Sequence, residues 1–166
     1  SNFNLYYEML KNVLTSHPYI CGVDLDIEEN VNLNDVIKLV NILKTDFGNE
    51  FLISFAPVAF ALQKNRTGMG GFLYNDLMNA IGHKIENLNT QFYYDFSVES
   101  YNEVIQNKYN PSQIILGMTQ NNTNEFKIVS DLCKKYKNFK GIFFWELVLL
   151  DNPIDWIKKM KSILEE

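Results

Sequence analysis

Five apolar, strand-like runs alternate with segments of helical periodicity along this chain of 166 residues. The strand-like runs are 19–28, 51–60, 90–96, 113–119 and 139–148, and the helical segments that follow them are 33–46, 72–82, 98–107, 124–137 and 153–164. Repeated strand–helix alternation predicts an α/β protein with a parallel sheet and right-handed crossovers. A doubly wound open sheet and a (β/α) barrel both satisfy this order.

Local signals also predict where individual helices lie. Asn32 or Asn34 can cap the helix predicted at 33–46, and Gly48 can close it. One further helix is predicted at 2–16, before the first strand. It places Leu5, Met9, Val13 and Leu14 at helical spacing, and His17-Pro18 would end it.

The first strand-like run carries carboxylates on one face. Strict alternation places Cys21, Val23, Leu25 and Ile27 on one side of the strand and Gly22, Asp24, Asp26 and Glu28 on the other. Helical segments on both sides of the run favour a covered parallel strand whose acidic face points into a shared interior. Crowded carboxylates there cannot all be ionised, so one of them can act as a general acid near neutral pH. An acidic but inert strand is the alternative.

The same sequence argues against a metal or cofactor site. The D-x-D-x-E stretch from Asp24 is unlike a calcium loop, because Glu29 occupies the position that needs Gly. No phosphate-binding G-x-G-x-x-G follows any predicted strand. The histidines and cysteines show no zinc-ligand spacing; they are His17, His83, Cys21 and Cys133. We therefore predict no metal and no cofactor.

Composition excludes two classes of partner. The net charge is −5 and the basic residues are dispersed, which argues against nucleic acid. The longest apolar stretch, 141–150, is interrupted by Glu146 and falls short of the roughly 18 residues that a membrane helix needs. An apolar content of 46% indicates a globular protein with a buried core.

Polar or aromatic side chains stand at the predicted C-terminal ends of three strands, where barrel enzymes place their active sites: Glu28, Tyr93 and Trp145. The stretch G-V-D-L-D-I-E at 22–28 resembles the D-G-x-D-x-D-x-E motif on the fourth barrel strand of glycoside hydrolase family 18, the chitinases and their relatives. Four later stretches resemble the fifth to eighth strands of the plant and fungal (hevamine-like) type in order: S-F-A-P at 54–57, Q-F-Y at 91–93, I-L-G at 115–117 and G-I-F-F-W at 141–145.

The resemblance implies a (β/α)8 TIM barrel of which this chain holds only about five βα units, with residues 1–166 as the C-terminal portion of the catalytic barrel. A complete barrel takes about 250 residues, and strands one to three have no counterpart here. The missing N-terminal half would come from the same or another chain. Cys21 stands where the family motif has its outermost Asp.

The resemblance further implies hydrolysis of β-1,4-linked N-acetylglucosamine polymers (chitin) by substrate-assisted retaining catalysis, and a secreted or extracellular location. Glu28 would be the general acid, Asp26 would orient the substrate acetamido group, and Asp24 would share a proton with Asp26. The alternative is a catalytically inactive chitinase-like protein that binds carbohydrate or serves a structural role.

Three further residues receive roles from the same resemblance. Tyr93 would donate its hydroxyl to the acetamido oxygen, Gln91 would support the sugar, and the Trp145 indole would form an apolar floor beneath it. Strand alternation predicts that Gln91, Tyr93 and Asp95 share one face.

Overall fold

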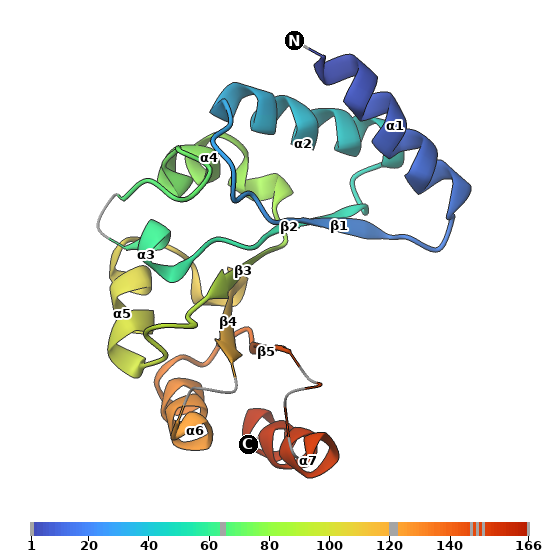
Figure 1. Ribbon diagram of the computed structural model, residues 1–166. Helices are drawn as coiled ribbons and strands as arrows, with labels where there is room; N and C mark the ends of the chain where they lie inside the picture. The colour runs from blue at the N-terminus through green and yellow to red at the C-terminus, as the bar shows by residue number, and fades with distance from the viewer. Residues whose placement is uncertain are drawn as a thin grey trace.

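The structure is a computed structural model that describes residues 2–63, 66–119, 123–146, 148, 150 and 152–165. Within these residues, five parallel strands form one sheet: β1 (Gly22–Leu25), β2 (Leu52–Phe55), β3 (Asn87–Gln91), β4 (Ile114–Thr119) and β5 (Ile142–Trp145). The strands lie in sequence order, each hydrogen-bonded to the next (Figure 1). A doubly wound sheet reverses its strand order at a switch point, whereas a barrel adds strands consecutively. The fold is therefore a partial (β/α) barrel.

Helices cover one side of the curved sheet, and the other side is left open (Figure 1). They are α1 (Phe3–Ser16), α2 (Leu33–Phe47), α3 (Ala59–Leu62), α4 (Tyr74–Ile81), α5 (Val98–Gln106), α6 (Glu125–Lys135) and α7 (Pro153–Leu164), with single 3-10 turns η1 (Gly82–Lys84) and η2 (Pro111–Gln113). The predicted order of elements is confirmed, apart from the short α3 and the two 3-10 turns.

Helix α2 shows how local chemistry sets an element's ends. The Asn32 side-chain oxygen accepts a hydrogen bond of 2.9 Å from the backbone N–H of Asn34, so Asn32 is the cap. Gly48 follows the last turn with a φ of 90°, which lies in a region that side chains disfavour. Both predicted end signals are confirmed.

The core lies between the sheet and the helices. Strand residues that face the helices are fully buried, among them Ile53, Phe55, Leu88 and Leu116. They meet buried helix residues such as Val40, Leu43, Leu77, Val104 and Leu132. Because this layer is apolar on both surfaces, burial of the outer face of the sheet stabilises the curved arrangement.

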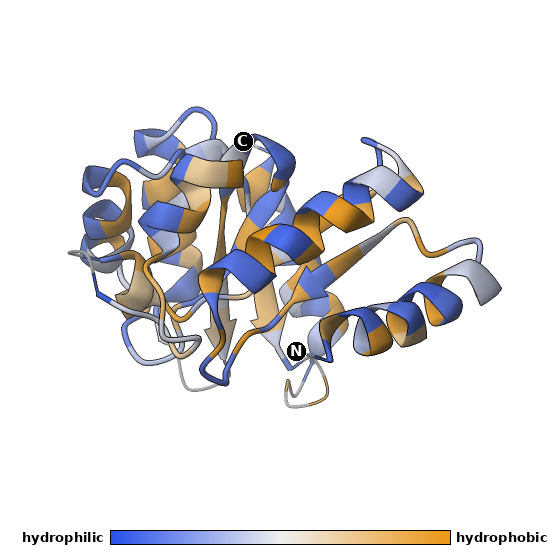
Figure 2. Cartoon of the chain, turned by 90° about the horizontal axis from the view of Figure 1, so that it is seen from above, coloured by the Kyte–Doolittle hydropathy of each residue, from blue (hydrophilic) through white to orange (hydrophobic). Residues whose placement is uncertain are grey.

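Most of the apolar face of α1 is exposed. Leu5, Met9 and Val13 are 61%, 59% and 53% exposed, and only Tyr7 and Leu14 are buried. Helix α1 lies at the open edge of the sheet, and α2 covers only one side of α1 (Figure 1). Apolar residues recur along α1 (Figure 2).

Two predicted strands are misplaced. The third strand is 87–91 rather than 90–96, and the second, whose run at 51–60 is predicted to end near Pro57, ends at Phe55 and is followed by α3. Strand β3 alternates buried Leu88 and Thr90 with amide side chains on the inner face, so its sequence is less apolar than the aromatic turn that follows. Hydrophobicity alone therefore placed the predicted third strand too far along the chain.

Both cysteines are free thiols, with Cys21 exposed and Cys133 partly buried. In the described part of the chain, no helix combines the length and the apolar character needed to cross a bilayer.

Candidate active site

The three acidic residues lie at the C-terminal end of β1. Asp24 is within the strand, and Asp26 and Glu28 follow its end. All three are exposed in this chain, so the prediction of an enclosed interior is wrong here. Five strands leave the inner face of the sheet open to solvent, although the acids still stand on that face.

Asp24 is held by two neutral donors. The Ser54 hydroxyl donates a hydrogen bond of 2.6 Å to Asp24 Oδ1, and the Asn89 side-chain amide donates one of 3.0 Å to the same oxygen. The register aligns Asp24 directly with Ser54 on β2. The sequence analysis missed both residues; the alternation of amides in 87–91 was the signal for Asn89.

Asp26 is the carboxyl group that its surroundings perturb most clearly. Partial burial raises the pKa of Asp26, and the negative charges of Glu28 and Asp24 raise it further. The Gln91 amide opposes this effect by donating a hydrogen bond of 3.3 Å to Asp26 Oδ1, while it also donates one of 2.8 Å to the Ala56 carbonyl. Gln91 therefore lies where the prediction placed it, beside the acids.

Tyr93 also faces the acids, but for a different reason than strand alternation. Strand β3 ends at Gln91, so Tyr93 belongs to the turn after it, and the shared strand face predicted for Gln91, Tyr93 and Asp95 does not exist. Asp95 instead accepts a hydrogen bond of 2.9 Å from the Ser97 hydroxyl. The Tyr93 ring lies edge-on to that of Phe143, with centroids 6.2 Å apart.

The electrostatic environment of Tyr93 keeps its hydroxyl protonated. Burial raises the pKa of Tyr93 to about 12, and the charges of Asp26, Glu28 and Asp24 add to the shift. A phenol of this kind is a permanent hydrogen-bond donor at neutral pH.

Trp145 ends β5 and is 60% exposed. Its neighbour Phe144 packs against Trp156 of α7, with ring centroids 5.2 Å apart. Alternation therefore places Trp145 on the opposite face, together with Phe143, which contacts Tyr93. The indole is available for stacking at the same end of the sheet as the acids.

The site thus combines three carboxylates, a protonated phenol, amide donors and an indole at one end of a parallel sheet. Carboxyl groups that raise one another's pKa can share a proton within the cluster, and general acid–base chemistry needs such a proton. Among the described residues, no three His, Cys, Asp or Glu side chains are grouped so that they could hold a metal ion.

Removing the charge of Glu28 should lower the pKa of Asp26 toward its ordinary value. Glu28→Gln removes the negative charge that raises the pKa of Asp26 most, so ionising Asp26 costs less. A pH titration of the Asp26 carboxyl carbon by ¹³C NMR measures this shift, with Glu29→Gln as the control. An unchanged Asp26 titration in Glu28→Gln would contradict the coupling.

The raised pKa of Asp26 also predicts how the free energy of unfolding changes with pH. Because the folded-state pKa of Asp26 is raised, the folded chain binds this proton more tightly than the unfolded chain. The free energy of unfolding should therefore fall as pH rises from about 3.9, the ordinary Asp pKa, through the raised value. Glu28→Gln should flatten this dependence in urea titrations.

Two solved structures share both fold and sequence with this chain. A fungal endo-β-N-acetylglucosaminidase from glycosyl hydrolase family 18 matches with a TM-score of 0.88 and 27% identity, over 98% of this chain and 62% of that one. The chitinase ChiC from Aspergillus fumigatus matches with a TM-score of 0.80 and 28% identity, over 95% of this chain and 63% of that one. The C-terminal domain of ChiA from Legionella pneumophila shares the fold, with a TM-score of 0.69 at 14% identity, over 98% of this chain and 69% of that one.

No protein-family model matches the chain. A search of curated proteins also gave no match. The chain spans less than two thirds of the length of the fungal endo-β-N-acetylglucosaminidase and of ChiC, 62% and 63%. Sheet order, the acidic strand and these structural matches agree: the described residues form a partial TIM barrel of five strands that resembles the corresponding part of glycoside hydrolase family 18 structures.

Proposed function

We propose that this chain forms the catalytic side of a glycoside hydrolase that cleaves β-1,4 links between N-acetylglucosamine units. The observation that carries the proposal is the cluster of Asp24, Asp26 and Glu28 at the end of one strand, with the protonated Tyr93 hydroxyl facing it. The enzymes named for the two matching structures, a chitinase and an endo-β-N-acetylglucosaminidase, support this substrate class.

The reaction we propose is substrate-assisted. Glu28 gives its proton to the glycosidic oxygen as the bond to the anomeric carbon breaks. The 2-acetamido oxygen of the same sugar forms the new bond to that carbon, which gives an oxazolinium ion. Water then attacks the anomeric carbon as its bond to the acetamido oxygen breaks, and water gives its proton to Glu28, which restores the acid. The two successive inversions at the anomeric carbon retain its configuration.

The two aspartates assist this step in the proposal. Asp26 accepts a hydrogen bond from the acetamido N–H, which orients the group and offsets its developing positive charge. Asp24 shares a proton with Asp26. The hydrogen bonds from Ser54 and Asn89 to Asp24 support this role, since they fix the Asp24 carboxylate in place.

The remaining residues bind the sugar in the proposal. Tyr93 donates its hydroxyl to the acetamido oxygen, and Gln91 supports the sugar from the end of β3. The exposed indole of Trp145 stacks against the apolar C–H face of the pyranose ring.

We also propose that three further strand–helix units, from the same or another chain, close the barrel. Among the residues that the structure describes, β1 pairs only with β2 and β5 only with β4, so each presents an unpaired edge. Apolar side chains are exposed on the helices next to both edges: Leu5, Tyr6, Met9 and Val13 on α1, and Ile154 and Ile157 on α7. Docked strand–helix units would satisfy both edges and cover these side chains.

The test compares the isolated chain with a closed barrel. We expect residues 1–166 alone to release no product from chitotetraose, because half of the sugar cleft is absent. The fungal endo-β-N-acetylglucosaminidase has strand–helix units that this chain lacks, and a chimera can add these units to residues 1–166. We expect the chimera to hydrolyse chitotetraose, as measured by chromatography of the products. Turnover by the isolated chain would contradict the need for closure.

A folded chimera that binds chitotetraose in calorimetry without cleaving it would reject hydrolysis. That result would instead favour a chitinase-like binding protein, an alternative motivated by Cys21, which stands where the family motif has its outermost Asp. A chimera that does not fold by circular dichroism would reject the barrel-closure proposal for these units.

A further inference from the structure

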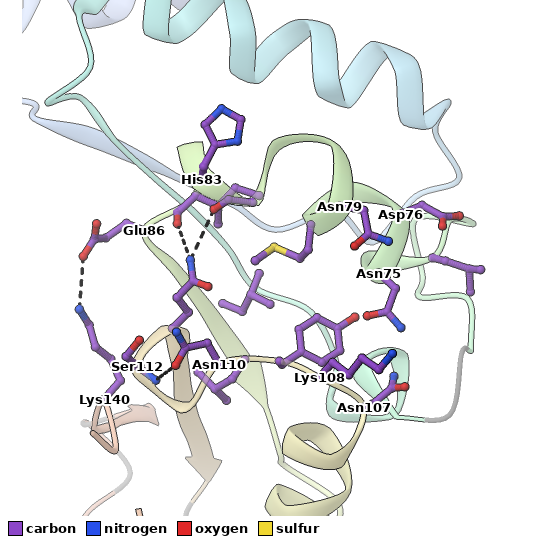
Figure 3. A pocket seen from close by; sticks show the side chains of 18 residues that line it. Asn75, Asp76, Asn79, His83, Glu86, Asn107, Lys108, Asn110, Ser112 and Lys140 are labelled. Atoms are coloured by element: carbon purple, nitrogen blue, oxygen red, sulfur yellow. Dashed lines mark hydrogen bonds and ion pairs between the residues drawn. The ribbon is translucent and has the colours of Figure 1, made fainter. Parts of the chain in front are cut away.

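The glycine-rich segment between α3 and α4 has no part in the reaction described above. Residues 66–72 read R-T-G-M-G-G-F, with glycine at three of the four positions 68–71. Helix α4 follows the segment, and its residues Asn75 and Asn79 line a cavity of about 1210 Å³ beside the N-terminal ends of β3 and β4 (Figure 3). None of residues 66–72 lines that cavity, and the segment instead contacts the loop that carries Glu28.

Gly70 makes two contacts with this loop, which follows β1. Its backbone oxygen accepts a hydrogen bond of 3.0 Å from the Val31 N–H. Gly70 is also buried, and a Cβ added to it would lie 2.9 Å from Ile27 Cγ2. Glycine therefore allows the backbone to pack directly against the Ile27 side chain. Because Ile27 precedes Glu28 and Val31 follows it by three residues, Gly70 holds the loop on both sides of Glu28.

Hydrogen bonds and aromatic packing anchor the segment itself. The Gly71 N–H donates a hydrogen bond of 3.0 Å to the Gly68 carbonyl, and the Gly68 N–H donates one of 3.1 Å to the Phe72 carbonyl. The Phe72 ring is buried, and its centroid lies 5.0 Å from that of Tyr74. Burial raises the pKa of Tyr74, and the negative charge of Asp26 raises it further, which places this aromatic pair near the acids.

This support matters most for Glu28 among the three acids. Asp24 and Asp26 each accept hydrogen bonds from neighbouring side chains. Glu28 is exposed and lies beyond the end of β1, so the backbone of its loop sets where its carboxyl group points. A general acid must lie within hydrogen-bond distance of the oxygen that it protonates, and a displacement of about 1 Å can cost about 10²-fold in rate.

We propose that Gly70 is a positioning residue for the acid Glu28: its carbonyl and its lack of a side chain fix Val31 and Ile27, and so aim the Glu28 carboxyl group at the glycosidic oxygen. This inference rests on the proposed hydrolase function. Gly70 does not touch the sugar and acts only through the loop.

The first test measures turnover numbers of Gly70→Ala, in the closed barrel, on two substrates. The added Cβ would press on the Ile27 side chain and the Phe72 ring and displace the loop, so the turnover number on chitotetraose should fall about 10- to 100-fold. The phenolate of a dinitrophenyl chitobioside leaves almost without protonation, so the turnover number on this substrate should fall less than about threefold. A general loss of folded protein would slow both substrates equally.

Gly68→Ala is the matched control in the same segment. A Cβ at Gly68 would lie 3.0 Å from the Tyr74 ring and 3.1 Å from the Ala61 Cβ, so it meets similar crowding without pressing on Ile27. We expect the ratio of the two turnover numbers in Gly68→Ala to equal that of the unmodified sequence.

Two variants of Ile27 test the same contact by removing atoms, which keeps the proposal testable if Gly70→Ala does not fold. Ile27→Ala removes the Cγ2 methyl that packs on Gly70, and Ile27→Val retains it. Ile27→Ala should slow chitotetraose by about threefold or more and leave the dinitrophenyl substrate nearly unchanged. Ile27→Val should behave like the unmodified sequence on both.

Hydrogen exchange tests the contact in the isolated chain without any catalysis. The Val31 amide exchanges when its hydrogen bond to Gly70 opens. Relative to the amide of the buried Leu43, Val31 should exchange about tenfold faster or more in Gly70→Ala and at an unchanged rate in Gly68→Ala.

Two results would overturn the positioning role of Gly70 and leave the hydrolase proposal standing. One is that Gly70→Ala or Ile27→Ala changes the two turnover numbers equally, and the other is that Val31 exchange stays unchanged in Gly70→Ala. A closed barrel of unmodified sequence that cleaves neither substrate would instead overturn the hydrolase proposal. The exchange rates would then still show whether Gly70 holds the loop.

Discussion

Glu28→Gln, placed in a closed barrel that contains this chain, should lower the turnover number on chitotetraose by about 10²- to 10⁴-fold. Gln has nearly the size of Glu but no acidic proton, so the glycosidic oxygen would leave without protonation. The Michaelis constant should change little, because the amide still fills the same place beside the sugar. Steady-state kinetics on chitotetraose measure both quantities.

The leaving group provides an internal control for this prediction. A dinitrophenyl chitobioside releases a weakly basic phenolate that needs little protonation, so Glu28→Gln should slow it far less than it slows chitotetraose. Glu29→Gln, at the next position, should leave both rates unchanged. Equal losses on the two substrates would show that Glu28 does not act as the acid.

Gly117→Ala should reduce the free energy of unfolding by about 3 kcal/mol, a large part of the usual total of about 5–15 kcal/mol. A Cβ at Gly117 would collide with the Phe143 ring and would lie 2.6 Å from the backbone oxygen of Thr90. The backbone oxygen belongs to the neighbouring strand β3, so it cannot move aside without distorting the sheet. Urea unfolding followed by circular dichroism measures the loss.

Gly82→Ala is the matched control for this change. Gly82 has a helical φ of −55°, and the nearest atom to an added Cβ is the flexible end of Met78 at 3.3 Å. We expect stability to stay the same or rise slightly, because Ala restricts the unfolded chain. If both variants lost equal stability, close strand packing at Gly117 would not be the cause.

The placement of the site depended on both local pattern and long-range pairing. Alternation along 22–28 was enough to predict that Asp24, Asp26 and Glu28 share a face, because the side-chain period of a strand is local. The partners of Asp24 could not be predicted in the same way. Ser54 and Asn89 reach it only through the register of three strands that are far apart in sequence.

Tyr93 shows that a correct position can follow from a wrong element. The aromatic run around Tyr93 suggested a strand, but β3 ends two residues earlier, and the turn rather than the pleat directs the ring toward the acids. The buried, polar-faced strand at 87–91 was missed because amides on the inner face lower its hydrophobicity. Whether a segment with so many amides forms a strand depends on its contacts with distant parts of the chain.

The sequence by itself determined the α/β class, the order of the units and the acidic face, because periodicity, helix caps and glycines act over a few residues. Only the tertiary structure decided that the strands add consecutively and that the α1 face stays exposed. These features depend on contacts between distant segments, whose geometry no local pattern specifies. A five-stranded sheet also leaves open the face that a closed barrel would enclose.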